Sequence, residues 1–283
     1  MIRMHPYRAA FISDLDGTLL RDPQGITPDD HAALVHLGTQ HVVRVIATGR
    51  AVHSVQNCLA ADFPIDYVIA SSGNQIVHWQ TQDVVHSSNL PVAHAMRIQD
   101  VLMDLDLCFM AHRDFPDNHA CIYQYGSSVP EDFRRRLGLY ASSSWHGLID
   151  QHWGAVSQFV AITEQVQAVE QVRTALADAS VIRATSPLDG RTVWIEIFAP
   201  QVCKANAIVR LTRGLGFTDQ PLAAIGNDFN DIDMLDLVHF PYIVSDALIT
   251  GQHYVQTPAR HTSAVAYAAK HFTQVIQGDW HGA

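Results

Sequence analysis

The sequence is poor in cysteine, in basic residues and in long apolar runs. Its 4 cysteines, at positions 58, 108, 121 and 203, are scattered through 283 residues and form no Cys-x-x-Cys pair. This usage argues against a disulfide framework and a zinc site, and it favours a reducing cytoplasm. No apolar stretch approaches the length of a membrane span, and the first residues contain no secretory hydrophobic segment, so we expect a cytoplasmic protein.

The low content of positive charge limits the partners that the chain can have. Lys and Arg total 18 against 28 Asp and Glu, which gives a formal net charge of −10, and no Lys/Arg-rich run occurs. Nucleic acid and anionic membranes are therefore poor partners. The 17 histidines show none of the tight spacings of metal ligands, and we interpret most of them as surface or packing residues.

The composition is that of a globular protein with two domains. Hydrophobic residues make up 48% of the chain and charged residues 16%, and 283 residues are comfortable for two compact units. At the N-terminal end, continuous apolar runs at 9–12, 41–47 and 66–70 alternate with helical segments, from Pro28 to about Leu37 and from about 52 to 59. Runs of this type are typical of parallel strands buried on both faces, so we predict a doubly wound, mostly parallel α/β sheet.

The pattern changes in the middle of the chain and then returns. Residues 87–198 are richer in strands, and 192–197 alternates like a strand with one solvent-exposed face. After Lys204 the helix–strand pattern of the first segment resumes. The sequence therefore predicts a core domain formed by 1–86 and 199–283, with a second α/β domain, 87–198, inserted into it.

Asp14 and Asp16 follow the first apolar run and precede Gly17, an unusual place for two acids. In an extended chain, residues i and i+2 project to the same side, so both carboxylates can face one ligand. One can act as a nucleophile and the other as a general acid and base. A hard divalent cation such as Mg²⁺ relieves their mutual repulsion. The alternative is a solvated Asp-x-Asp-Gly turn.

Three further polar segments fall where the predicted elements place a strand end or a helix start. Thr48 and Gly49 can hold phosphate oxygens or cap a helix, and Lys204 can neutralise an anion or lie on the surface. The 226–231 segment, Gly-Asn-Asp-Phe-Asn-Asp, is a cation-binding loop or an ordinary acidic turn. A carboxylate, a hydroxyl, a lysine and a metal loop are together what phosphoryl transfer needs, because that reaction depends on positioning and electrostatics.

With these motifs the chain resembles the haloacid dehalogenase-like superfamily, and within it the Cof-type sugar-phosphatase subfamily. The resemblance is carried by residues 14–20, 46–50, 195–204 and 226–235. It implies a Rossmann-like core with an inserted α/β cap that selects the substrate. It also implies that Asp14 attacks phosphorus and becomes the aspartyl-phosphate, while Asp16 protonates the leaving group and then activates water.

The resemblance implies binding roles as well. The phosphoryl group would be bound by Leu15, Thr48, Gly49, Lys204 and Asn230, and Mg²⁺ would be held by Asp14, the Asp16 backbone carbonyl and the side chain at 227. The family usually has Asp directly after the glycine, whereas this chain has Asn227. Either Asn227 binds the cation directly, or Asp228 or Asp231 supplies charge as an additional ligand or from beside the ligands.

The sequence thus predicts a Mg²⁺-dependent phosphatase that acts on small phosphorylated metabolites, sugar phosphates first. The polar segment 112–119 of the inserted domain either contacts sugar hydroxyls or is a solvated hairpin loop. Three alternatives stay open. A phosphomutase would return the phosphoryl group to the substrate, a phospho-acceptor signalling domain would keep it, and a binding protein would have lost turnover through the Asn227 substitution.

Overall fold

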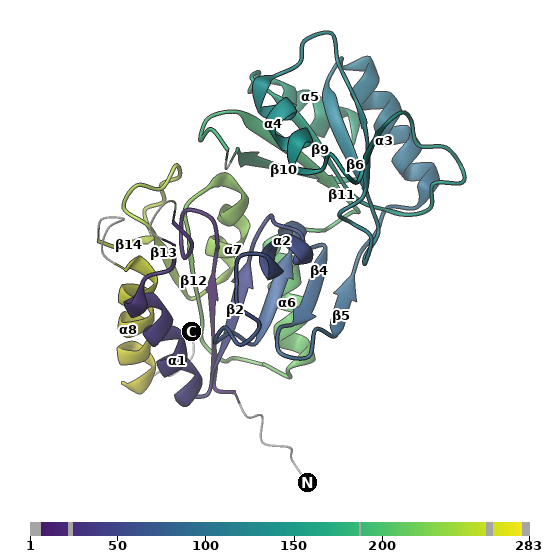
Figure 1. Ribbon diagram of the computed structural model, residues 1–283. Coiled ribbons are helices and arrows are strands. Elements are labelled where there is room, and N and C mark those ends of the chain that lie inside the picture. The colour runs from purple at the N-terminus through teal and green to yellow at the C-terminus, as the bar shows by residue number, and fades with distance from the viewer. Residues whose placement is uncertain (1–6, 22–24, 187, 259–262, 279–283) are drawn as a thin grey trace. The chain divides into compact units, whose positions relative to one another are not determined.

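The computed structural model describes residues 7–21, 25–186, 188–258 and 263–278. Its internal contacts divide the chain into two units, one formed by Met1–His86 with Lys204–Ala283 and the other by Ser87–Cys203 (Figure 1). The second unit is thus inserted into the first. The chain returns to the first unit after Cys203 rather than after Phe198, because Ala199 and Val202 pack in the hydrophobic cluster of the inserted unit.

The first unit is built on a sheet that has eight strands in the described chain, in the order β14-β13-β12-β1-β2-β3-β4-β5. These strands are β1 (Ala9–Ser13), β2 (Val42–Ala47), β3 (Tyr67–Ala70), β4 (Gln75–His78), β5 (Val84–Ser87), β12 (Leu222–Gly226), β13 (Phe240–Ile243) and β14 (Val255–Gln256). From β14 to β3 the neighbours pair in parallel, whereas β4 runs antiparallel to β3. The carboxyl ends of the central strands therefore meet at one edge, where open α/β sheets bind ligands.

Helices cover both faces of this sheet. They are α1 (Pro28–Thr39), α2 (Val52–Gln56), α6 (Lys204–Gly214), α7 (Ile232–Leu237) and α8 (Ala264–Gln277), with 3₁₀ turns η1 (Ser71–Gly73) and η2 (Phe229–Asp231). On one face α6 and α7 contribute Leu211 and Leu235 to a core that contains Ile12. On the other face α1 lies beside α8 (Figure 1), and the rings of Phe11 and Phe272 are 6.2 Å apart. The predicted doubly wound α/β class is confirmed.

Local signals in the sequence explain part of this unit. Thr27 caps α1, since its hydroxyl oxygen accepts the Asp30 N–H at 3.1 Å, and Pro28 occupies the first helical position, as predicted. Two expectations differ from the structure. Helix α2 ends at Gln56 rather than near 59, because the Cys58 N–H bonds to the Val55 carbonyl and tightens the chain into a turn. The β4–β5 extension of the sheet was not predicted.

In its described residues, the inserted unit has a sheet of six strands, in the order β10-β11-β9-β6-β7-β8. Its elements are α3 (Val92–Asp104), β6 (Cys108–Arg113), β7 (Cys121–Gln124), α4 (Glu131–Leu139), β8 (Ser144–His146), β9 (Val156–Thr163), α5 (Ala168–Ala175), β10 (Ser180–Thr185) and β11 (Val193–Phe198). Most of the pairs are antiparallel, although β7 and β8 run in parallel.

Burial in the inserted unit corrects two expectations. Strand β11 is buried along its whole length, so the solvent-exposed face predicted for 192–197 is wrong; Glu196 is only 4% exposed. Clusters of apolar side chains cover both sides of the sheet and account for this burial. In the 112–119 segment, His112 belongs to β6 and is buried, and Asn118 is buried as well. These two residues are therefore packed side chains rather than members of a solvated loop.

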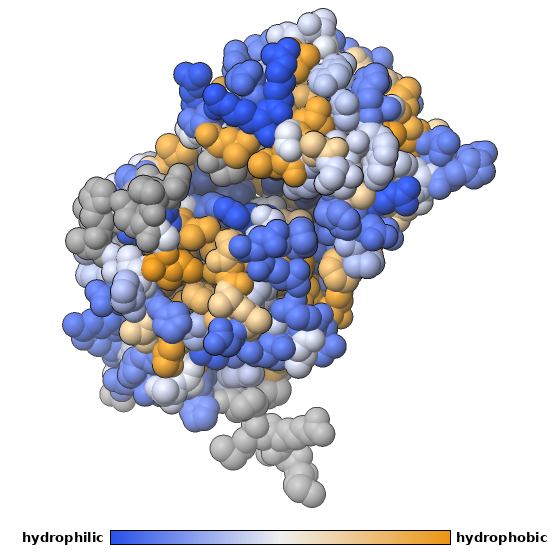
Figure 2. Space-filling view, viewed as in Figure 1, coloured by the Kyte–Doolittle hydropathy of each residue, from blue (hydrophilic) through white to orange (hydrophobic). Residues whose placement is uncertain are grey.

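The surface mixes polar and apolar residues. On the face drawn in Figure 2, hydrophobic residues lie in small groups among hydrophilic ones. Within the described segments, none of the helices combines the length and the apolar character that crossing a bilayer requires.

Candidate active site

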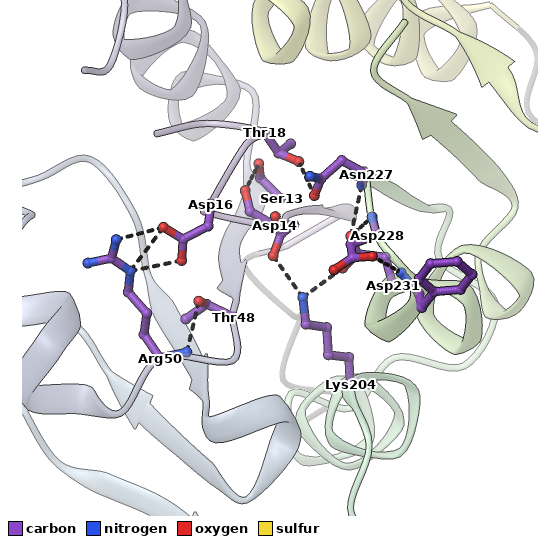
Figure 3. A network of polar contacts seen from close by, with 11 residues as sticks. Ser13, Asp14, Asp16, Thr18, Thr48, Arg50, Lys204, Asn227, Asp228 and Asp231 are labelled. Carbon is purple, nitrogen blue, oxygen red and sulfur yellow. Dashed lines mark hydrogen bonds and ion pairs between the residues drawn. The ribbon is translucent and has the colours of Figure 1, made fainter. Parts of the chain in front are cut away.

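The predicted site residues come together at the carboxyl ends of adjacent strands (Figure 3). Asp14 directly follows β1, and Asn227 directly follows β12, the strand that pairs with β1 on one side. Thr48 directly follows β2, which pairs with β1 on the other side. Lys204 begins α6 and reaches the same place. Segments that are distant in sequence thus converge on Asp14.

A buried lysine joins two of the acids. Lys204 Nζ donates to Asp14 Oδ1 at 2.8 Å and to Asp231 Oδ1 at 2.6 Å. Lys204 and Asp231 are fully buried, and Asp14 is 5% exposed. Charges this deep are costly unless they are paired, so this triad fixes the position of Asp14 in the site.

The triad perturbs its own titration. Burial, and then the charge of Asp231, raise the pKa of Asp14 to about 8, although Lys204 opposes the shift. Burial disfavours the charge of Lys204, but Asp14 and Asp231 outweigh it and raise the pKa of the ammonium. Two carboxylates thus share one cation at this point, and a second cation would relieve the excess negative charge.

The loop after β12 is held in shape by Asp231. Its Oδ2 accepts the N–H groups of Asn227 at 2.8 Å and of Asp228 at 3.1 Å, while Asp228 Oδ1 accepts the Phe229 N–H at 2.7 Å. Gly226 leaves room for this arrangement, because a Cβ there would lie 2.6 Å from Asp231 Cγ. Asn230 is half-buried in the same turn. Both acids of the loop therefore accept backbone N–H groups, and Asp231 also bonds to Lys204.

Asp16 turns away from Asp14, so the expectation that both carboxylates face one ligand does not hold in this structure. Its side chain forms a bidentate ion pair with Arg50, with Arg50 Nε at 2.8 Å from Oδ2 and Nη2 at 2.6 Å from Oδ1 (Figure 3). The extended geometry behind the expectation ends at Ser13. Beyond it the chain curls, with the Leu20 N–H bonded to the Leu15 carbonyl and Gly17 at φ 78°.

Thr48 and Gly49 lie beside the acids but do not cap a helix. The next helix, α2, begins only at Val52, and the hydroxyl oxygen of Thr48 accepts the Arg50 N–H at 3.1 Å. Thr48 is buried at the end of β2, on the side of Asp16 and Arg50 in Figure 3. It therefore shapes the turn that carries Arg50.

The donors next to Asp14 fit a hard cation. The Asn227 side-chain atom that faces the site lies 3.1 Å from Asp14 Oδ2 and 3.2 Å from the Asp16 carbonyl oxygen. Neighbouring oxygens around an octahedral Mg²⁺ are about 3 Å apart, and Mg²⁺ accepts carboxylate, carbonyl and amide oxygens. In the described part of the chain, no three His, Cys, Asp or Glu side chains are grouped as metal ligands.

Comparison with known proteins identifies the family. The sequence profile of the haloacid dehalogenase-like hydrolases matches residues 11–268. The chain is 24% identical over 271 residues to the putative phosphatase YxeH of Bacillus subtilis, which covers 90% of this chain and 94% of the relative. It is 22% identical to the pyridoxal phosphate phosphatase YbhA of Escherichia coli, over 79% of this chain and 82% of the relative.

Solved structures agree with this fold. The subclass IIB sugar phosphatase BT4131 superposes with a TM-score of 0.74 at 18% identity, covering 94% of this chain and 99% of that one. The phosphatase BT1666 of Bacteroides thetaiotaomicron gives a TM-score of 0.72 at 18% identity, over 96% and 98% of the two chains. The chain belongs to the haloacid dehalogenase-like hydrolases, which confirms the resemblance that its motifs carry.

Two residues of the site escaped the sequence analysis. Arg50 was part of a motif, but nothing in its spacing indicated that it pairs with Asp16 across 34 positions. Thr18 lies 3.2 Å from the Asn227 side chain, and it is fully buried. Its place after Asp-x-Asp-Gly was the only signal in the sequence.

Proposed function

We propose that this chain hydrolyses phosphate monoesters of small metabolites, most readily sugar phosphates, through a phosphorylated Asp14 and with Mg²⁺ as cofactor. The observation that carries the proposal is the buried Asp14–Lys204–Asp231 triad beside a set of oxygen donors. The phosphatase names of its relatives, and the sugar-phosphatase neighbours of its fold, support the substrate class.

The residues divide the reaction between them. An Asp14 carboxylate oxygen attacks phosphorus, the bond from phosphorus to the ester oxygen breaks, and the departing alcohol takes a proton from Asp16. In the second step Asp16 takes a proton from water, which attacks phosphorus and releases phosphate and free Asp14. Asp14 and a phosphoryl group are both negatively charged and repel each other. The positive charge of Lys204 offsets this repulsion.

Asp16 has to leave its present position for the first of these steps. The bidentate pair with Arg50 occupies both carboxylate oxygens of Asp16, so the side chain has to leave the pair to reach a departing alcohol. Both side chains are about one-third exposed, so breaking the ion pair costs little free energy. Arg50 is thus a positioning residue that holds the acid–base group when substrate is absent.

The cation would be held by Asp14, the Asp16 carbonyl and Asn227. The side-chain atom of Asn227 that faces the site lies close to Asp14 Oδ2 and to the Asp16 carbonyl oxygen. When bound, Mg²⁺ supplies positive charge for the phosphoryl oxygens. Thr48, Gly49, Leu15 and Asn230 are proposed to bind the phosphoryl group, and the inserted unit, 87–203, is proposed to select the substrate as a cap.

A phosphate-release screen over sugar phosphates and other phosphorylated metabolites tests the proposal. The wild type should release phosphate, chelation should stop the release and added Mg²⁺ should restore it, whereas Asp14→Asn should be inactive while still folded. Near wild-type turnover by Asp14→Asn would defeat the mechanism. Formation of an isomeric sugar phosphate in place of free phosphate would favour a mutase, and a long-lived phosphoprotein without turnover would favour a phospho-acceptor.

A further inference from the structure

In the described part of the chain, the side chain of Asn227 lies against the other groups proposed to hold the cation. Its terminal atom lies 3.1 Å from Asp14 Oδ2, 3.2 Å from the Asp16 carbonyl oxygen and 3.2 Å from Thr18 Oγ1. The Asp16 carbonyl is an acceptor only, Asp14 Oδ2 is an acceptor only while Asp14 is ionised, and the hydroxyl of Thr18 either donates or accepts. The three groups therefore repel or bond to Asn227 according to whether Oδ1 or Nδ2 occupies this position.

An amide has two such atoms of nearly equal size. With Oδ1 toward the site, three oxygens, from Asp14, Asp16 and Asn227, face one another, which is favourable only around a cation. With Nδ2 toward the site, the amide has two N–H groups to share among Asp14 Oδ2, the Asp16 carbonyl and Thr18 Oγ1, and no cation is needed. Both orientations fill the same volume, so a turn about one side-chain bond exchanges them.

We propose that the side-chain amide of Asn227 has two orientations. When the cation is absent, its N–H groups donate to the oxygens that would hold the cation, and when the cation is present, Oδ1 binds it. The proposal rests on the proposed function only in taking this place as the cation site. An aspartate at the same place can accept but not donate, so it would leave the cation-free site with carboxylates in unrelieved contact.

Two consequences follow for this chain. The cation must displace the hydrogen bonds of the amide and receives no charge from position 227, so it binds weakly and exchanges readily. The cation-free protein keeps an ordered site, since Asp14 is bonded by Lys204 on Oδ1 and by Asn227 on Oδ2.

Direct binding measurements test this without any assay of turnover. Mn²⁺ binding is followed by electron paramagnetic resonance, and Mg²⁺ by competition, for the wild type and Asn227→Asp. We expect the variant to bind at least about tenfold more tightly, because ligand charge sets affinity at such sites. Asn230→Asp is the matched control, since it puts the same charge on the same loop, and its Kd should change less.

Thermal unfolding in chelator supplies the second measurement. Asn227→Asp should melt at a lower temperature than the wild type without cation and should gain more from added Mg²⁺. Asn227→Ala, which only loses the hydrogen bonds, should also melt lower without cation. An unchanged Kd in Asn227→Asp, equal tightening by Asn230→Asp, or a cation-free Asn227→Ala as stable as the wild type would each overturn the proposal. None of these results would contradict phosphatase activity.

Discussion

Removal of the Lys204 ammonium tests how strongly the triad depends on its one cation. Lys204→Met keeps the unbranched shape and most of the length of the side chain but leaves Asp14 and Asp231 facing each other in a buried place. Breaking a buried ion pair by removal of one partner costs about 3–5 kcal/mol. For a unit of this size that corresponds to a fall in Tm of roughly 10 °C.

The raised pKa of Asp14 determines how the stability cost of Lys204→Met changes with pH. The pKa of Asp14 is raised to about 8 from an ordinary value of 3.8, so its contribution to stability is present at low pH and is lost as pH rises through 8. Without Lys204 the pKa of Asp14 should rise further, so this loss of stability should extend to higher pH than in the wild type. The deficit of Lys204→Met should therefore be smallest near pH 5 and should grow as pH rises past 8.

The assay is thermal and urea unfolding in chelator, at several pH values, with Lys270→Met as control. Lys270 is the other lysine of the sequence, is exposed on α8, and its loss should cost less than about 0.5 kcal/mol. Adding Asp231→Asn to Lys204→Met removes one of the two acids and should recover part of the loss. A cost below about 1 kcal/mol for Lys204→Met, with no dependence on pH, would refute the reasoning.

Two further predictions concern residues outside the triad. Arg50→Lys keeps the charge but loses the bidentate contact with Asp16, which Asp16 has to leave in order to act, so kcat should not fall and KM and Tm should change little, whereas a tenfold fall in kcat would contradict a role limited to the substrate-free state. Burial lowers the pKa of His112 to about 3, so its contribution to stability is lost as pH falls from about 6.5 toward 3. In His112→Asn the free energy of unfolding should fall less steeply with falling pH in that window. The same substitution at the exposed His119 should leave the pH dependence unchanged. Equal curves for His112→Asn and the wild type would contradict this role of His112.

The sequence was informative where the chemistry is local. A buried run followed by Asp14, the Thr27 cap and the Pro28 start of α1 predicted strand, turn and helix, and the structure has each of them. Parallel strands bring their carboxyl ends together, so the approach of Asn227 and Thr48 to Asp14 followed from topology alone.

The parts that were missed depend on tertiary contacts. The direction of the Asp16 side chain is set by Arg50, which lies 34 residues away, and by a curl of the chain that begins where β1 ends. The burial of Glu196 and His112 depends on helices that cover the second sheet, and a pattern of alternating residues cannot show them. The orientation of the Asn227 amide depends on three groups that only the fold brings together.

The central claim is that Asp14 carries the phosphoryl group during turnover. Acid quenching during turnover, followed by borohydride reduction and mass spectrometry of the peptides, locates an acyl phosphate because reduction converts a phosphorylated aspartate to homoserine. The account predicts modification at Asp14 and nowhere else, with none in Asp14→Asn. Turnover without any acyl phosphate, or modification at Asp16 or Asp228 in place of Asp14, would contradict it.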